Sequence, residues 1–383
     1  MTQVVQEMSS EILSGPPPAT KRPENYLTLD AWRGVAALSV CVYHSSAVIV
    51  DKQLNGHSTP FYDVCMYGFL GVQIFFVISG YCIAASAASV LRNGKPLSNF
   101  VIARIRRIYP ACWASLLLIL GLQVLATTLV RAGILHDSTM ANTSVSHDAL
   151  FWFSNVTLTQ VFLNQNFISA VCWTLCYEIA FYMLVAAAIV GVRVFSRHRS
   201  VDRLLLILHG VSIISLVGLI ASRSHVPFPF DLWPQFGLGI VAFHWLNGGN
   251  KRIAWVCSAI IGLLTCVFIA SRNADLSVMH LSSRLVYTTS LVFAACVIPL
   301  RSIDTRMSKS HVVSLLRWIG LFSYSLYLTH FVMLGMINQL LRIGLKTSAY
   351  HYLQMPVSVF LAVVAGWLFY LVAEKPFLAK SRS

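Results

Sequence analysis

Two ionisable side chains stand in the first long apolar stretch of the chain, Arg33 near its start and His44 eleven residues later. Eleven residues are about three helical turns, so both side chains fall on one face of a helix, roughly 16 Å apart along its axis. Ionisable groups are costly inside a membrane span and indicate a functional site. An imidazole at such a depth suits a general base, and an arginine suits an anion-binding group.

A single acid, Glu178, stands in a later apolar stretch near 171–192. Residue counting places His44 about 9 Å and Glu178 about 11 Å below the same membrane face, and Gln73 of the second stretch reaches a comparable depth. An acid beside a histidine orients the ring and raises its basicity. We therefore expect His44 and Glu178 to form a catalytic dyad. The alternative is that each is a buried structural group, hydrogen-bonded to a neighbouring helix.

Three arginines, Arg104, Arg106 and Arg107, follow one another closely in a basic segment at 92–108, which we expect to be a cytoplasmic loop. A guanidinium binds phosphate through two parallel hydrogen bonds, so the cluster suits a phosphate-bearing ligand. Membrane topology alone also predicts basic residues here. Pro110 then suits the first turn of the next helix.

Two further segments mix polar with aromatic residues. Residues 71–80, which include Ser79, combine small residues with aromatics, and small residues in membrane helices often only permit close packing. His330 ends the sequence Phe-Ser-Tyr-Ser-Leu-Tyr-Leu-Thr-His near the middle of another apolar stretch. It is equally suited to a polar contact between helices and to catalysis.

The composition excludes a soluble protein. The chain has 383 residues, of which 57% are hydrophobic and only 11% charged, with a mean hydropathy of +0.70, so its polar residues cannot cover a globule. Apolar blocks of about 18–25 residues are long enough to cross a bilayer as helices. We predict an all-α integral membrane protein, a bundle of about ten transmembrane helices. The blocks lie near 29–50, 69–91, 109–130, 171–192, 204–221, 230–246, 253–271, 285–300, 317–341 and 355–373.

The net charge of +14 reflects topology and requires no nucleic-acid partner. With a cytoplasmic N-terminus, 21 of the 28 Lys and Arg residues fall on the cytoplasmic side, as the positive-inside rule requires. Both termini are then cytoplasmic. We expect 1–26 to be a disordered cytoplasmic tail, 27–375 the membrane domain and 376–383 a second cytoplasmic tail. The segment 131–170 reads as an external loop with an interfacial part.

The nine cysteines lie mostly in apolar stretches and behave as small hydrophobic residues, so we expect no disulfide framework. Cys172 and Cys176 stand one helical turn apart, but no histidine or acid beside them completes a metal-binding pattern. We therefore expect no metal site.

Five blocks, in order, carry a resemblance to a known family. They are 29–34 continuing to His44, 71–80, 104–110, 173–182 and, more loosely, 322–330. The chain resembles the membrane-bound acyltransferase-3 family, whose members O-acylate bacterial surface polysaccharides, lipopolysaccharide O-antigen and nodulation signals. Ala31 stands where the family commonly has glycine, and Gln73 where an acid is frequent, which argues against a role that needs a carboxylate at 73.

The resemblance implies transfer of an acyl group, expected to be acetyl, from cytoplasmic acyl-CoA to a hydroxyl of an exported, cell-surface or lipid-linked glycan. Acyl-CoA is then a co-substrate and no cofactor stays bound. The family pattern maps the arginine and histidine of the first span onto Arg33 and His44, and its acid onto Glu178. The location is the bacterial cytoplasmic membrane, and the further partners are the glycan acceptor and the lipid bilayer.

We expect His44 and Glu178 to be catalytic, and a larger set to bind the substrates. That set comprises Arg33, Gln73, Ser79, Arg104, Arg106, Arg107, Trp173, Tyr324 and His330. The alternative function is a transporter or flippase for a glycan or lipid-linked substrate, because intramembrane His and Glu also serve in proton relays. Against it, the sequence shows no sign of paired inverted repeats with broken helices.

Overall fold

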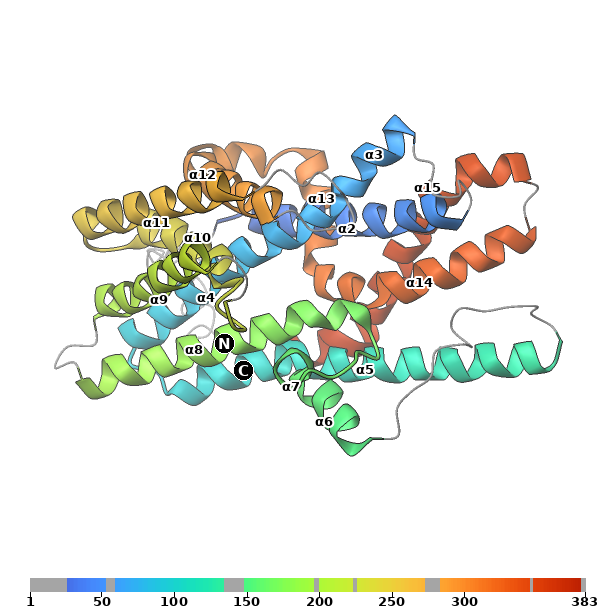
Figure 1. Ribbon diagram of the computed structural model, residues 1–383, viewed down its shortest axis with the longest axis horizontal. Helices are drawn as coiled ribbons and strands as arrows, with labels where there is room; N and C mark the ends of the chain where they lie inside the picture. The colour runs from blue at the N-terminus through green and yellow to red at the C-terminus, as the bar shows by residue number, and fades with distance from the viewer. Residues whose placement is uncertain are drawn as a thin grey trace, which may run out of the picture.

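The computed structural model describes residues 26–52, 59–133, 148–195, 200–222, 226–272, 283–344 and 347–379, and every regular element in these ranges is helical. Most long helices run side by side along the long axis of the molecule (Figure 1). The helices are α2 (Leu29–Lys52), α3 (Pro60–Met66), η1 (Tyr67–Leu70), α4 (Gly71–Arg92), α5 (Leu97–Arg131), α6 (Ala149–Thr157), α7 (Gln160–Leu163), η2 (Ala170–Cys172), α8 (Trp173–Phe195), α9 (Val201–Ala221), α10 (Trp233–Asn247), α11 (Lys251–Ser271), α12 (Ser283–Met307), α13 (His311–Leu321), α14 (Ser323–Gly344), α15 (Thr347–Phe369), η3 (Tyr370–Glu374) and α16 (Lys375–Ala379).

The predicted class of multi-span helical membrane protein is confirmed. Among the described residues, 7 helices are long and apolar enough to cross a membrane, or 8 if the bent pair α13 and α14 is one span. Each of the predicted apolar blocks coincides with a helix. Two predicted blocks are not among these candidate spans. They are the block of α2 and the block of α10, and α10 has only 15 residues. The total of about ten spans and the side of each terminus remain predictions.

The prediction of a loop over 92–108 is wrong, because α5 already begins at Leu97. This helix has 35 residues and is therefore about 52 Å long, against a hydrocarbon core of about 30 Å. Its first turns, which carry the three arginines, can thus stand in water while the rest spans the membrane. Pro110 lies in the interior of the helix and not in its first turn.

The block near 317–341 is not one straight helix. The chain bends by 75° between α13 and α14. The cause is a backbone contact between α13 and α2: a Cβ added at Gly320 would lie 1.7 Å from the carbonyl oxygen of Asp30, and one at Gly34 would lie 2.1 Å from that of Leu316. α13 therefore follows α2 closely before the chain turns, and the bend directs α14 along the core.

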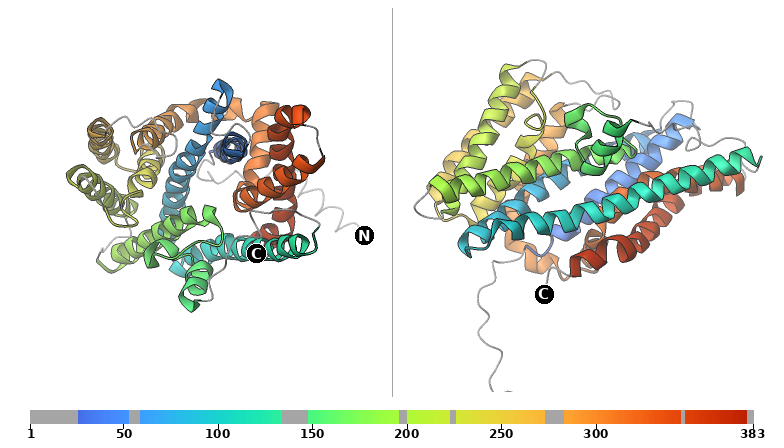
Figure 2. Two further views of the ribbon diagram at one scale, coloured as in Figure 1. Left: turned by 45° about the vertical axis from the view of Figure 1, so that its right-hand side comes forward. Right: turned by 90° about the horizontal axis from the view of Figure 1, so that it is seen from below.

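Close helix contacts also account for the small residues of 71–80. A Cβ added at Gly80 of α4 would lie 2.0 Å from the carbonyl oxygen of Phe236 in α10, and one at Gly239 of α10 would lie 2.0 Å from that of Val77. Small residues thus let the two backbones touch. Figure 2 (left) shows α2 almost end-on, between α4 and the C-terminal helices α13 to α15.

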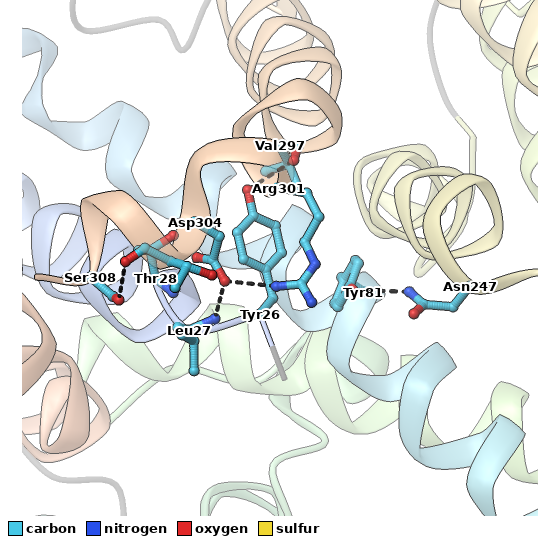
Figure 3. Close-up of polar contacts among 10 residues, drawn as sticks. Tyr26, Leu27, Thr28, Tyr81, Asn247, Val297, Arg301, Asp304 and Ser308 are labelled. Atoms are coloured by element: carbon cyan, nitrogen blue, oxygen red, sulfur yellow. Dashed lines mark hydrogen bonds and ion pairs between the residues drawn. The ribbon is translucent and has the colours of Figure 1, made fainter. Parts of the chain in front are cut away.

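A short segment before α2, Tyr26–Thr28, is held against α12 (Figure 3). The backbone N–H groups of Leu27 and Thr28 donate to the buried carboxylate of Asp304 at 2.7 and 2.9 Å. Arg301 donates to the same carboxylate at 2.7 Å. These bonds fix the point at which the chain enters α2.

Parts of the predicted tails and of the predicted external loop lie outside the described residues, namely 1–25, 134–147 and 380–383. Of the predicted N-terminal tail, only Tyr26 is described, and it is buried, with its hydroxyl donating to the carbonyl oxygen of Val297 at 2.8 Å. Of the predicted C-terminal tail, residues 376–379 continue the chain as α16. The described part of the 131–170 segment contains the short helices α6 and α7.

Candidate active site

A cavity of about 100 Å³ lies between α2, α4, α5, α8 and α14, and we call it the core cavity. Six residues of the predicted site line it: Arg33, Ser79, Arg104, Arg107, Glu178 and Tyr324. They come from five helices that are far apart in the sequence. The structure therefore gathers more than half of the predicted set around one hollow.

Glu178 projects from α8 into the core cavity and is bonded there on two sides. Its Oε1 accepts hydrogen bonds from the hydroxyl of Ser79, at 3.3 Å, and from the hydroxyl of Tyr182 one turn further along α8. The guanidinium of Arg104 lies over the Tyr182 ring, 5.6 Å from its centroid. The carboxylate thus sits in a polar cluster with the Arg104 guanidinium close by.

Arg33 lies where the core cavity meets a second hollow. This end pocket, of about 630 Å³, opens at the end of the bundle where α2 begins and where α4 and α10 finish. Arg33 and Cys82 line both hollows. The guanidinium donates to Asp30 at 2.6 Å and to the Sγ of Cys82 at 3.3 Å.

The end pocket is polar and carries positive charge. Besides Arg33, its lining includes Arg92 and Arg317, with Asn93, Asn247 and Tyr81 between them. Asn247 donates to the Tyr81 hydroxyl at 3.0 Å. Several arginines around an open hollow form a surface suited to a polyanionic ligand.

His44 does not line the core cavity. Its ring lies against those of Tyr43, His330 and Phe331, with centroids 4.7, 5.1 and 5.2 Å away. Both His44 and Glu178 are described, and no hydrogen bond or ion pair joins them. The expected contact within a His44–Glu178 dyad is therefore absent: similar depth on two helices does not make their side chains face each other.

His330 is fully buried on α14, and its ring is held by the backbone of its own helix. The Nδ1 atom lies 2.7 Å from the carbonyl oxygen of Tyr327 and 3.2 Å from that of Leu326. The Tyr327 ring, 5.6 Å away, lines the core cavity. His330 thus lies one turn behind the cavity wall and next to His44.

The other predicted residues have packing roles or lie elsewhere. Arg106 is exposed on α5 and does not line either hollow. Trp173 packs on Phe76 and Tyr177, with ring centroids 6.3 and 6.0 Å away.

Gln73 is buried, and its Oε1 has no hydrogen-bond partner within the described part of the chain. Tyr324 anchors its hydroxyl on the carbonyl oxygen of Ile108 at 2.8 Å.

Sequence reasoning missed four residues near the site: Cys82, Tyr182, Tyr327 and Glu374. The first three line the core cavity. Glu374 is only 2% exposed, lies in the π-helical segment η3 and accepts a hydrogen bond from the Ser325 hydroxyl at 2.6 Å. An isolated acid at the end of an apolar stretch is a signal for such a residue, and π-helical turns are frequent at functional sites.

No group of three or more His, Cys, Asp or Glu that could hold a metal ion occurs among the described residues. The cavities carry arginines, hydroxyl groups and two carboxylates, Glu178 in the core cavity and Asp30 in the end pocket.

Comparison with known proteins gives the same assignment as the motifs. The family model described as "Acyltransferase domain" matches residues 26–373. A Staphylococcus aureus (strain COL) protein named "Putative O-acetyltransferase" is 29% identical over 381 residues, which cover 91% of this chain and 56% of the relative. The peptidoglycan O-acetyltransferase OatA of Listeria monocytogenes is 25% identical over 335 residues, 82% of this chain and 50% of the relative.

The O-acetyltransferase OatA of Staphylococcus aureus (strain NCTC 8325) is 27% identical over 369 residues, covering 90% of this chain and 55% of the relative. The chain thus spans about half the length of the curated relatives that it matches. No solved structure matches it. Because the family model covers nearly the whole chain, this protein belongs to the acyltransferase-3 family.

Proposed function

We propose that this protein is an O-acetyltransferase of the bacterial cytoplasmic membrane, which moves an acetyl group from cytoplasmic acyl-CoA to a hydroxyl of an exported or cell-surface glycan. The observation that carries the proposal is the position of Arg33, which lines both the end pocket and the core cavity. A long donor with a charged head and a thin acylated arm fits two hollows joined at an arginine. The names of the relatives support acetyl as the group and, in one case, peptidoglycan as the kind of acceptor.

The end pocket would hold the nucleotide end of the donor. Its arginines, Arg33, Arg92 and Arg317, offer the paired N–H donors that phosphate groups prefer. The pantetheine arm would then pass Arg33 and Cys82 into the core cavity. Arg104 and Arg107 line that cavity and would add positive potential along the arm.

The chemistry requires a base for the acceptor hydroxyl. His44 lies about three helical turns, roughly 16 Å, beyond Arg33 on the same helix, a span that the pantetheine arm can bridge. His44 would accept the hydroxyl proton as the hydroxyl oxygen bonds to the thioester carbon. The carbon–sulfur bond then breaks, and the CoA thiolate leaves and takes the proton. A route through an acetylated His44 takes two steps: a bond from the His44 nitrogen to the acetyl carbon forms as the carbon–sulfur bond breaks, and that carbon–nitrogen bond then breaks as the hydroxyl oxygen bonds to the carbon, with the hydroxyl proton passing to the CoA thiolate.

The cluster of Glu178, Ser79 and Tyr182 would act on the donor side of the reaction. Its hydroxyl groups and carboxylate line the core cavity beside Arg104. In this position they can hold the pantetheine arm that leads to the thioester and shape the cavity around it. Transport without chemistry is the less favoured function, because the family and its named relatives are transferases.

Transfer of label tests the proposal. Membrane vesicles that contain the protein should move radiolabelled acetyl from acetyl-CoA to added cell-wall glycan, and vesicles without the protein should not. His44→Ala should lose this activity at normal protein levels, while His311→Ala, at an exposed histidine of α13, should keep it. No transfer by the wild type to any of a panel of peptidoglycan, teichoic and exopolysaccharide acceptors would contradict the proposal.

A further inference from the structure

His330 is placed to act on His44, and its protonation pattern can be read from its contacts. Its Nδ1 faces two carbonyl oxygens, those of Tyr327 and Leu326, at 2.7 and 3.2 Å. A carbonyl oxygen only accepts hydrogen bonds, so Nδ1 must carry the hydrogen. In the neutral ring, Nε2 is then a bare acceptor.

That acceptor has no partner in the described structure. His330 Nε2 is buried without a hydrogen bond, and the residue is 0% exposed. A buried acceptor left unpaired is costly and calls for an explanation. The imidazole of His44 is the titratable group next to it, with the ring centroids 5.1 Å apart.

Another histidine pair in the same molecule provides a reference for this distance between ring centroids. The rings of His209 and His244 have centroids 5.2 Å apart, and their facing nitrogens lie 2.9 Å from each other. A centroid distance of 5.1 Å therefore allows an N–H···N hydrogen bond once the rings face each other. The rings of His44 and His330 are inclined by 43°, so the hydrogen bond requires the partly exposed His44 ring to turn towards His330.

We propose that His330 is the positioning residue of His44: its Nε2 accepts a hydrogen bond from one ring nitrogen of His44 and leaves the other nitrogen free to take the proton of the acceptor hydroxyl. The inference rests on the proposed function and gives His330 the role that a carboxylate plays in other histidine-based sites. Fixing the tautomer of a catalytic imidazole in this way can be worth several orders of magnitude in rate.

The arrangement also explains the backbone contacts of His330. A hydrogen bond from Nδ1 to the Tyr327 carbonyl keeps Nε2 aimed away from the helix axis and makes it a better acceptor. When the other nitrogen of His44 gains a proton, the N–H that His44 donates to His330 becomes a charged donor, and this hydrogen bond strengthens without an ionised acid nearby. His330 itself touches neither hollow, so it acts through His44 and not on the substrate.

Two substitutions at one position test the proposal. His330→Gln keeps an oxygen acceptor near the place of Nε2, whereas His330→Phe keeps the volume and removes the acceptor. We expect kcat for acetyl transfer to fall about 100-fold in His330→Phe and clearly less in His330→Gln, with KM for acetyl-CoA unchanged within about twofold. The double variant His44→Ala/His330→Phe should be no worse than His44→Ala alone, because groups that act as a unit are not additive.

The matched control is His209→Gln, which replaces a buried histidine outside the site. It should lower thermal stability and leave kcat unchanged, which separates the cost of losing a buried imidazole from a catalytic effect. A folded His330→Phe with normal kcat, or losses that multiply in the double variant, would overturn the positioning role. Those results require an active wild type, whereas an inactive wild type would contradict the proposed function itself.

Discussion

The guanidinium of Arg33 donates a hydrogen bond to the Sγ of Cys82 at 3.3 Å, and these two side chains line both the end pocket and the core cavity. Arg33 comes from α2 and Cys82 from α4, so the contact also ties together two helices of the core. A ligand that occupied both hollows would have to pass this pair. The contact is therefore a place at which the proposed position of the donor can be tested.

Arg33→Lys should raise KM for acetyl-CoA by about 10- to 100-fold, because an ammonium cannot replace the two parallel hydrogen bonds of a guanidinium to phosphate. The measurement is the rate of acetyl transfer as a function of acetyl-CoA concentration. Arg106→Lys is the control, since Arg106 is exposed on α5 and lines neither hollow. An unchanged KM in Arg33→Lys would remove Arg33 from the donor site.

A thiol reagent should block the enzyme at Cys82. This is the cysteine that lines the two hollows, whereas Cys266 and Cys296 are exposed on other helices and can react without obstructing the site. We expect N-ethylmaleimide to abolish most acetyl transfer by the wild type and to leave Cys82→Ser active. Bound CoA should slow this inactivation. Equal loss of activity in the wild type and in Cys82→Ser would refute the proposal that the donor arm passes Cys82.

Glu178 and Tyr182 should behave as one unit, because the Tyr182 hydroxyl donates directly to the Glu178 carboxylate. Glu178→Gln and Tyr182→Phe should each lower kcat, and the double variant should be little worse than the more damaged single one. By contrast, His44→Ala and Glu178→Gln should give losses that multiply, since no contact joins these residues. A double-mutant cycle of kcat values measures both cases, and strong coupling of His44 with Glu178 would restore the dyad.

Gly320→Ala should destabilise the protein, because the new Cβ would lie 1.7 Å from the carbonyl oxygen of Asp30 and would push α13 away from α2. Overpacking of this kind costs about 1–3 kcal/mol, which a thermal melt in detergent detects. Gly335→Ala on α14 is the matched control, since nothing lies within 4 Å of its added Cβ. A wild-type melting temperature for Gly320→Ala would show that the two backbones are not in contact.

In the predicted ten-span topology, 21 of the 28 basic residues fall on the cytoplasmic side, and this bias predicts the orientation of the chain. Reporter fusions after Lys95, after Asn142 and at the C-terminus should read inside, outside and inside. An outside reading at the C-terminus would require an odd number of spans. It would contradict the total of ten.

The sequence by itself determined the class, the approximate place of most long helices and part of the candidate site. Apolar blocks coincide with helices because a membrane span needs about 20 apolar residues and must satisfy its backbone hydrogen bonds internally. Arg33, Glu178 and the arginines of α5 could be predicted as site residues because charge inside or beside a span is rare and costly. Four of these, Arg33, Arg104, Arg107 and Glu178, do line the core cavity.

Local packing decided where helices begin and bend. The sequence at 97–108 reads as a basic loop by its charge, yet its leucine, alanine and arginine residues are good helix formers and continue α5 outwards. The bend before α14 depends on Gly320 meeting the backbone of α2, which is a contact across nearly the whole chain. Hydropathy cannot reveal such a contact.

Only the tertiary structure decided the partner of His44. Counting residues gives depth along a helix axis, and it assigns similar depths to His44 and Glu178. Depth is one coordinate, however, and each residue step turns a side chain by about 100° around the axis. The packing of α2 against α14 turns His44 towards His330, while α8 turns Glu178 towards Ser79 and Tyr182. Which side chains meet is therefore set by the rotation and neighbours of each helix, and these depend on contacts between segments far apart in the sequence.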